Sequence, residues 1–334
     1  MSPHRACAAL ALSIAALLGF SAQAGEPRSA CSARPAASAT LAELRTAIAH
    51  GRFVAYTPTS LAAIDGRITP ADEPGIRSDL EVLRSRFDGL ITYGASHGAE
   101  AIPAIAAALN YRAVIIGIWD PDDAAEVAAA TAAARRFPHL VLGLSLGNER
   151  LFARHTDPAR LASRVARLRA ELPGTPLSTS EPFHVFDEPA AAALLAELDF
   201  LLLNVHPVFQ PWFAHASDET AARFVVNVVE QFAARVCGPV LVKETGVPTA
   251  PANKGFTVAR QASFYAELRR LLPSSGDRGF AYFAAFDAPW RAYDATGVPG
   301  AAPAVHEEEA HWGLYDSGRH PKPAALALTR LPAH

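Results

Sequence analysis

The sequence holds few sulfur-containing residues and little net charge. Its 334 residues include three cysteines and one methionine, and the formal charge is −3 at pH 7. That balance provides no basic surface to attract nucleic acid, so we expect no nucleic-acid partner. Beyond the N-terminal twenty residues, no apolar run is long enough to cross a bilayer. We therefore expect neutral or weakly charged partners, and no membrane contact in the mature form.

The N-terminus is typical of an export signal. A modest positive start precedes an apolar run over residues 8–20, which is too short for a comfortable membrane span. Ala22-Gln23-Ala24 has the small-x-small pattern of a cleavage site. We predict a secretory signal over residues 1–24 and a secreted or periplasmic location; the alternative is an uncleaved anchor.

Two cysteines, Cys31 and Cys237, remain after removal of that signal. An exported protein can form disulfides, so the two could form a bridge, or each could be a buried free thiol. Residues 25–42 are rich in Ala, Ser, Pro and Arg, and we expect them to form a mobile mature N-terminus. Residues 43–334 then form one catalytic domain.

That domain alternates between short apolar runs and amphipathic helical stretches. Apolar residues recur at i, i+3 and i+4 in the helical stretches, and Asp122 and Asp157 precede two of them as N-caps. The alternation predicts parallel strands with right-handed crossovers, and eight such units close into a single α/β fold, the (β/α)8 TIM barrel. The expected strands cover residues 52–56, 89–93, 112–118, 141–147, 176–180, 200–206, 239–243 and 279–286. Clear helical stretches cover residues 79–86, 122–136, 158–172, 219–236 and 258–272.

An open doubly wound sheet is the alternative architecture. It predicts a glycine-rich phosphate-binding turn after an early strand, and the sequence has none. The barrel is therefore the favoured fold.

Two glutamates fall where a barrel carries its catalytic groups, at the carboxyl ends of strands. Glu149 follows the fourth expected strand and Glu244 follows the seventh. These strands lie nearly opposite each other in a barrel, so the two side chains can converge over one mouth. Such a pair suits acetal cleavage, because a protonated carboxyl helps the leaving oxygen depart while an ionised one attacks the anomeric carbon. Alternation along the strand predicts that Lys243 points away from Glu244, so we assign it no part in keeping Glu244 ionised.

Several motifs surround these glutamates. Lys243-Glu244-Thr245-Gly246-Val247-Pro248 ends an apolar strand, and Gly147-Asn148-Glu149 ends another. Three further segments lie at residues 178–186, 283–290 and 311–316. In this order the motifs resemble glycoside hydrolase family 17, the β-1,3-glucanase family, and its bacterial branch in particular. The resemblance runs from about residue 51 to residue 323.

This resemblance implies a (β/α)8 barrel and hydrolysis with retention through a covalent glucosyl-enzyme. It implies that Glu149 is the general acid/base and that Glu244 is the nucleophile. The substrate would be a β-1,3-glucan polysaccharide or oligosaccharide. Asn148 would contact the sugar 2-hydroxyl, since an amide both donates and accepts; its alternative role is to form the turn.

Three positions depart from the family pattern. Val247 replaces a tryptophan, which we expect to alter packing rather than chemistry. Thr92 stands where relatives often place an arginine, ahead of Tyr93, which we retain as a substrate-binding residue. His206 stands where plant members have a tyrosine that donates to the nucleophile, and a ring N–H can do the same; a buried structural histidine is the alternative.

Aromatic and polar side chains near the mouth are the remaining candidates for sugar binding. Trp290 follows the eighth expected strand within a matching motif. Glu181 and His184 follow the fifth strand and could bind hydroxyls, or Glu181 could be a buried structural partner. Further aromatic candidates are Phe183, Trp119, Phe209 and Trp212.

Metal and serine chemistry find no support in the sequence. His306 and His311 are five residues apart rather than four, so they do not share a helix face as the zinc-protease motif requires. No Gly-x-Ser-x-Gly motif is present. We expect no metal, no cofactor and a monomeric protein. Two alternatives keep the same site: a β-1,3-glucan transglycosylase, and a glucan-binding protein with weakened catalysis.

Overall fold

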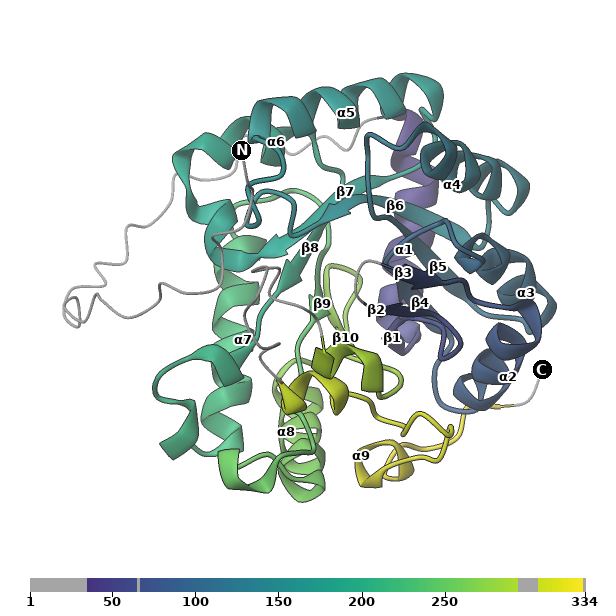
Figure 1. Ribbon diagram of the computed structural model, residues 1–334. Coiled ribbons are helices and arrows are strands. Elements are labelled where there is room, and N and C mark those ends of the chain that lie inside the picture. Colours follow the sequence, from purple (N-terminus) through teal and green to yellow (C-terminus); the bar gives the residue numbers. More distant parts are fainter. Residues whose placement is uncertain (1–34, 65–66, 294–305, 333–334) are drawn as a thin grey trace, which may run out of the picture.

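The computed structural model describes residues 35–64, 67–293 and 306–332, and it confirms the predicted (β/α)8 barrel. Eight parallel strands close in the order β1-β10-β9-β8-β7-β6-β5-β4, with helices around them (Figure 1). The barrel strands are β1 (Phe53–Tyr56), β4 (Gly89–Thr92), β5 (Ala113–Ile118), β6 (Val141–Asn148), β7 (Leu177–Pro182), β8 (Leu201–Asn204), β9 (Val240–Glu244) and β10 (Arg278–Tyr282).

Five of the helices that cover the barrel have a side-chain N-cap. The carboxylate of Asp157 accepts from the backbone N–H of Arg160, as the sequence predicted. The predicted cap Asp122 is wrong: Asp123 caps the next helix, while Asp122 pairs with Arg160. The helices are α2 (Glu73–Arg84), α3 (Ile102–Ala108), α4 (Ala124–Arg136), α5 (Pro158–Glu171), α6 (Ala192–Glu197), α7 (Asp218–Ala233), α8 (Val258–Leu271) and α9 (Pro323–Leu326).

An N-terminal helix, α1 (Ser38–His50), closes the floor of the barrel. Its buried side chains, among them Leu44 and Ile48, form one apolar cluster with inward-facing strand residues such as Phe53 and Leu241. Helix α1 therefore begins inside the segment 25–42 that we expected to be mobile. The predicted signal and Cys31 lie outside the described residues, and Cys237 is disulfide-bonded.

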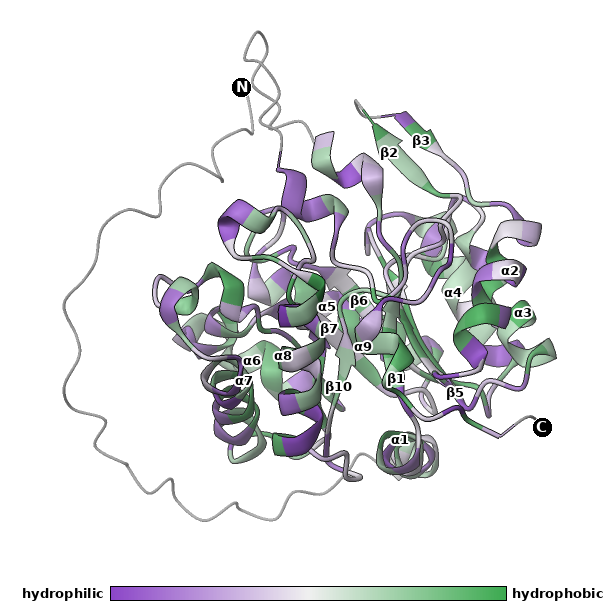
Figure 2. Ribbon diagram, turned by 90° about the horizontal axis from the view of Figure 1, so that it is seen from below, coloured by the Kyte–Doolittle hydropathy of each residue, from purple (hydrophilic) through white to green (hydrophobic). Residues whose placement is uncertain are grey.

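A short hairpin lies at the opposite end of the barrel from α1, as Figure 2 shows. Strands β2 (Ala62–Ile64) and β3 (Arg67–Thr69) pair antiparallel, and the sequence analysis did not predict them. They follow β1, so the hairpin belongs to the loops at the carboxyl end of the barrel. Among the described residues, no helix has both the length and the apolar character that a membrane crossing requires.

The strand register shifts just before both of the catalytic candidates. On β9, Val242 pairs with Leu203 and Glu244 pairs with Asn204, so Lys243 is an extra residue in a β-bulge. The second shift lies between β6 and β7. From Ser145 to Asn148, β6 advances by three positions, while β7 advances by two between their partners, Ser178 and Ser180. A bulge breaks the alternation of side chains and re-aims those that follow it.

Candidate active site

Glu149 stands directly beyond β6 at the carboxyl end of the barrel. Its backbone has a φ of 54°, a left-handed conformation that is unfavourable for a residue with a Cβ. The backbone N–H of Glu149 donates to the carbonyl of Ser180 over 2.8 Å, which holds this turn against β7. The register shift and the turn together aim the carboxyl group into the mouth.

The Glu149 carboxyl accepts a hydrogen bond from a residue that the sequence analysis did not select. Asn204, the last residue of β8, donates from Nδ2 to Glu149 Oε1 over 2.9 Å. The hydroxyl of Ser180 donates to Asn204 Oδ1 over 2.8 Å, and this fixes the orientation of the amide. The sequence signal that could have identified Asn204 is a polar side chain at the end of the sixth expected strand.

Glu244 ends β9 and is buried. His206 Nε2 lies 3.3 Å from Glu244 Oε2, as expected for a residue that donates to the nucleophile. The His206 ring packs against Phe283 and Trp312, with centroids 5.6 and 5.2 Å away, and these two rings also contact each other. Trp312 was not among the predicted site residues, although it lies in a recognised motif.

The two glutamates have opposite pKa shifts. Burial raises the pKa of Glu149, the negative charge of Glu244 raises it further, and the Asn204 amide opposes both. Burial alone would raise the pKa of Glu244, but the hydrogen bond with His206 and the charge of Lys243 lower it below its usual value. A site that needs one protonated and one ionised carboxyl group requires such a difference between the two pKa values.

Lys243 faces the site, which corrects the prediction that it points away. Its ammonium lies 4.0 Å from Glu244 Oε1 and donates to Asn148 Oδ1 over 2.7 Å. The cause is the β-bulge at this position, which interrupts the strand alternation on which the prediction depended. Asn148 thus lies at the mouth as predicted, beside an unexpected cation.

Tyr93 and Thr92 point in different directions at the end of β4. The Lys243 ammonium lies 4.0 Å from the centroid of the Tyr93 ring. Burial, together with the charge and a hydrogen bond of Glu244, raises the pKa of the Tyr93 hydroxyl. Thr92 instead accepts from the backbone N–H of Gly117 over 3.0 Å and is buried. Tyr93 therefore belongs to the site, whereas Thr92 supports the strands.

Glu181 has the buried structural position that the sequence analysis gave as the alternative to hydroxyl binding. It is fully buried and accepts from the backbone N–H groups of Leu151 and Phe152, over 2.9 and 3.2 Å. Burial raises its pKa to about 7 despite these donors. Its carboxyl group thereby anchors the loop that follows Glu149.

The remaining sugar-binding candidates lie on loops around the mouth. Trp290 is half-buried in a short helix after β10, beside Arg291. His184 is exposed after β7, with its ring edge-on to Phe152 and Phe183 at 5.7 Å each. Neither contacts the two glutamates, so a role in binding stays a prediction.

Two small features explain the segment after Glu244. A Cβ at Gly246 would lie 2.3 Å from the carbonyl oxygen of Phe283, so only glycine allows β9 and β10 to approach this closely. Val247 is fully buried in the core, which agrees with the expectation that its departure from the family affects packing.

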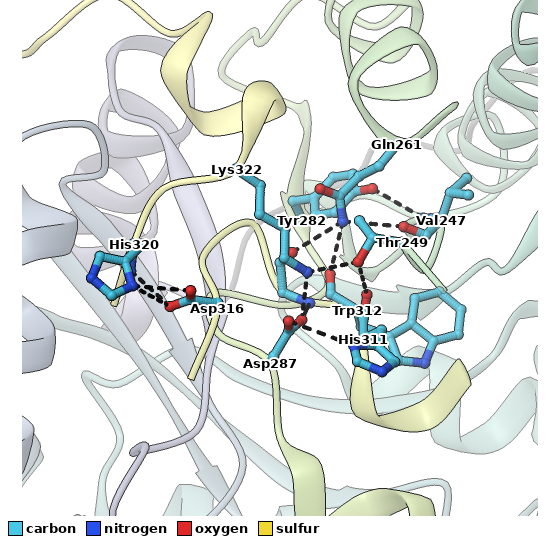
Figure 3. Close-up of polar contacts among 11 residues, drawn as sticks. Val247, Thr249, Gln261, Tyr282, Asp287, His311, Trp312, Asp316, His320 and Lys322 are labelled. Carbon is cyan, nitrogen blue, oxygen red and sulfur yellow. Dashed lines mark hydrogen bonds and ion pairs between the residues drawn. The ribbon is translucent and has the colours of Figure 1, made fainter. Parts of the chain in front are cut away.

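A polar network holds the C-terminal segment that carries Trp312 (Figure 3). The Lys322 ammonium donates to Asp287 over 2.7 Å and to Thr249 over 2.8 Å, and Asp287 also accepts from the N–H of Gly313. The side-chain amide nitrogen of Gln261 donates to the backbone carbonyl oxygens of Val247, Trp312 and Gly313. The network fixes the turn and so presses Trp312 against His206.

Paired carboxyl groups with divided pKa values, at the carboxyl end of a (β/α)8 barrel, are the arrangement of a glycoside hydrolase. The chain belongs to the BtgE/BtgC glycoside hydrolase domain family, whose model matches residues 54–313. A glucan 1,3-beta-glucosidase of Arthroderma benhamiae is 24% identical over 266 residues, which cover 75% of this chain and 84% of that protein. A probable glucan endo-1,3-beta-glucosidase of Emericella nidulans is 27% identical over 185 residues, covering 48% of this chain and 40% of its own length.

Solved structures support the fold at lower identity. A glycoside hydrolase family 17 beta-1,3-glucanosyltransferase from Rhizomucor miehei has a TM-score of 0.59 at 23% identity, covering 81% of this chain and 95% of its own. An endo-laminarinase from Formosa has a TM-score of 0.64 at 18% identity, covering 80% and 83%. These two likenesses show the shared (β/α)8 fold. The family resemblance read from the motifs is confirmed in part, as a glycoside hydrolase domain with distant similarity to a fungal glucan 1,3-beta-glucosidase.

Proposed function

We propose that this protein is a retaining glycoside hydrolase that cleaves β-1,3-glucosidic bonds of glucans, with Glu149 as acid/base and Glu244 as nucleophile. The observation that carries the proposal is the position of Glu149 and Glu244 at the carboxyl ends of two barrel strands, each beside its own polar partner, Asn204 and His206. The opposite directions of their pKa shifts agree with it. The names of the relatives, a glucan 1,3-beta-glucosidase among them, supply the substrate class.

The chemistry would take two balanced steps. In the first, a Glu244 oxygen attacks the anomeric carbon, the glycosidic C–O bond breaks, and Glu149 gives its proton to the leaving oxygen. In the second, a water oxygen attacks the same carbon and passes a proton to Glu149, and the bond to Glu244 breaks. This route requires carboxyl groups roughly 5–5.5 Å apart. Neither step calls for a cofactor.

His206 and Asn204 would assist different stages. A hydrogen bond from His206 stabilises the ionised Glu244 before attack and the departing carboxylate afterwards. Asn204 occupies Glu149 Oε1, so the other oxygen is left to carry the transferable proton. The two carboxyl groups are thus supported by separate donors.

A glucan transglycosylase is the second candidate, because one similar structure is a beta-1,3-glucanosyltransferase. The covalent intermediate would be the same, and a sugar hydroxyl would replace water in the second step. We further propose that the chain acts outside the cytoplasm, on the strength of the signal-like residues 1–24.

The test is incubation of the protein with laminarin oligosaccharides, with mass and linkage analysis of the products over time. Shorter β-anomeric products support hydrolysis with retention, whereas longer or branched ones support transfer. Binding without any turnover would instead favour the glucan-binding alternative. The Glu149→Gln/Glu244→Gln double variant is the matched control, because it keeps the shape of the site and removes both carboxyl groups.

A further inference from the structure

Lysine is rare in this chain. The sequence has three lysines, Lys243, Lys254 and Lys322, against 27 arginines. Lys254 and Lys322 pair with acidic side chains outside the mouth, Glu308 and Asp287. Lys243 alone among the three lies beside the nucleophile, and its side chain is 1% exposed.

The contacts of Lys243 use both its charge and its donors. Its ammonium lies over the Tyr93 ring, 4.0 Å from the centroid, and 4.0 Å from Glu244 Oε1. The same ammonium donates to Asn148 Oδ1 over 2.7 Å. A lysine cannot accept a hydrogen bond, so the Asn148 oxygen must face it and the amide nitrogen must face elsewhere.

We propose that Lys243 is a positioning residue of the catalytic pair: it orients the Asn148 amide with its nitrogen toward the sugar, and it supplies the counter-charge of Glu244. This inference rests on the proposed function for its catalytic consequence. A compact ammonium suits the role, because the planar fork of an arginine spreads its charge and donors over a larger area.

The two glutamates exchange charge during the proposed reaction, and the ammonium lies within range of both. Before attack, Glu244 is ionised and Lys243 balances it. In the covalent intermediate Glu244 is a neutral ester, and Glu149 has become ionised by giving its proton to the leaving oxygen, so that it can act as base. The positive charge of Lys243 lowers the pKa of Glu149 and so favours that change.

Several charged or titratable groups surround this cation. Burial lowers the pKa of Lys243 to about 8, and the charges of Glu244, Glu149 and Glu181 oppose the shift. Tyr93 faces it from the end of β4, while His206 and Arg291 act on the shared neighbour Glu244. The charges of these carboxyl groups limit the shift that burial causes, so the pKa of Lys243 stays above neutral pH.

The first test reads the titration of Lys243 directly and needs no turnover. With 13C-labelled lysine, NMR should resolve three Cε signals, assigned by Lys254→Met and Lys322→Met. We expect the Lys243 signal to titrate near pH 8, and at lower pH in Glu244→Gln, because an opposite charge has been removed. The same titration in wild type and Glu244→Gln would overturn the pairing.

The second test measures the catalytic consequence. In Lys243→Met, the acidic limb of kcat/KM should move to higher pH by on the order of one unit, because the nucleophile loses its counter-charge. Lys243→Arg keeps the positive charge but spreads it over a larger fork, so it should restore the limb only in part. Lys254→Met is the matched control: it removes a lysine that pairs with Glu308 outside the mouth, and it should leave the acidic limb in place.

The outcomes separate this inference from the proposed function. If the wild-type protein turns over no glucan, the proposed function fails, while the NMR titration still decides the pairing of Lys243 with Glu244. If the wild type is active and Lys243→Met keeps its acidic limb, the inference is wrong. Should Lys243→Met fail to fold, the Glu244→Gln titration remains decisive.

Discussion

Asn204 donates to Glu149 across the mouth of the barrel, and Ser180 decides which way its amide faces. Three successive strands, β6, β7 and β8, therefore contribute to the state of one carboxyl group. The donor stabilises the ionised form of Glu149, against the burial and the negative charge that stabilise the protonated form. The pKa of the proposed acid is thus a balance that single substitutions can shift.

Asn204→Ala should raise the pKa of Glu149 further, because a donor to its ionised form is removed. The alkaline limb of kcat/KM should move to higher pH, and the maximum should fall roughly tenfold as the carboxyl group loses its orientation. Ser180→Ala is a milder variant of the same kind, since the amide remains. A pH–rate profile identical to that of the wild type would count against this role of Asn204.

Glu149→Gln should lose about 10²- to 10⁴-fold in kcat on β-1,3-glucan, because the leaving oxygen receives no proton. Aryl glucosides with good leaving groups need little acid help, so cleavage of their bond should be affected much less. Steady-state rates on both substrate types make the comparison. Equal losses on the two would contradict the assignment of Glu149 as acid.

Glu244→Ala should abolish turnover of natural glucan, because no nucleophile remains to form the covalent intermediate. Azide can occupy the vacated space and attack from the same face, so added azide should restore cleavage of an activated aryl glucoside. The expected product, detected by NMR, is a glycosyl azide with inverted configuration. Wild-type turnover by this variant would refute the assignment.

Glu181→Gln should change the pH dependence of stability. A pKa of about 7 in the folded protein lies above the ordinary value of 4.5, so the contribution of Glu181 to stability is fully present below pH 4.5 and lost as pH rises through 7. The loss amounts to about 3 kcal/mol. Denaturant unfolding at pH 4.5 and pH 8 should show a smaller difference in the variant than in the wild type. An equal difference would mean that Glu181 is not the titrating group.

Much of the fold was predictable because each barrel strand is an apolar run bounded by helical stretches. All eight expected strands overlap the observed ones, and Glu149 and Glu244 lie at the strand ends as predicted. The β2–β3 hairpin was missed because its strands have three residues each and no alternating pattern. Helix α1 was not predicted, because its first turn, Ser38-Ala39-Thr40, has the composition of the preceding segment that we expected to be mobile.

The site was less predictable where the backbone departs from regular geometry. Lys243 was placed on the wrong face because a bulge does not reveal itself in the residue types of β9. Asn204 contacts Glu149, and Trp312 contacts His206, through positions that only the closed barrel brings together. Burial of Glu181 likewise depends on the path of the loop after Glu149, which the sequence does not specify.

The helix beneath the barrel restricts how a polymer can reach these residues. Since α1 and its apolar neighbours fill the axis from below, no polysaccharide can thread through the barrel. If the protein cleaves glucan as proposed, a long polymer would lie across the rim with both of its ends leaving sideways. Each fragment cut free would then depart through the same opening by which the polymer arrived.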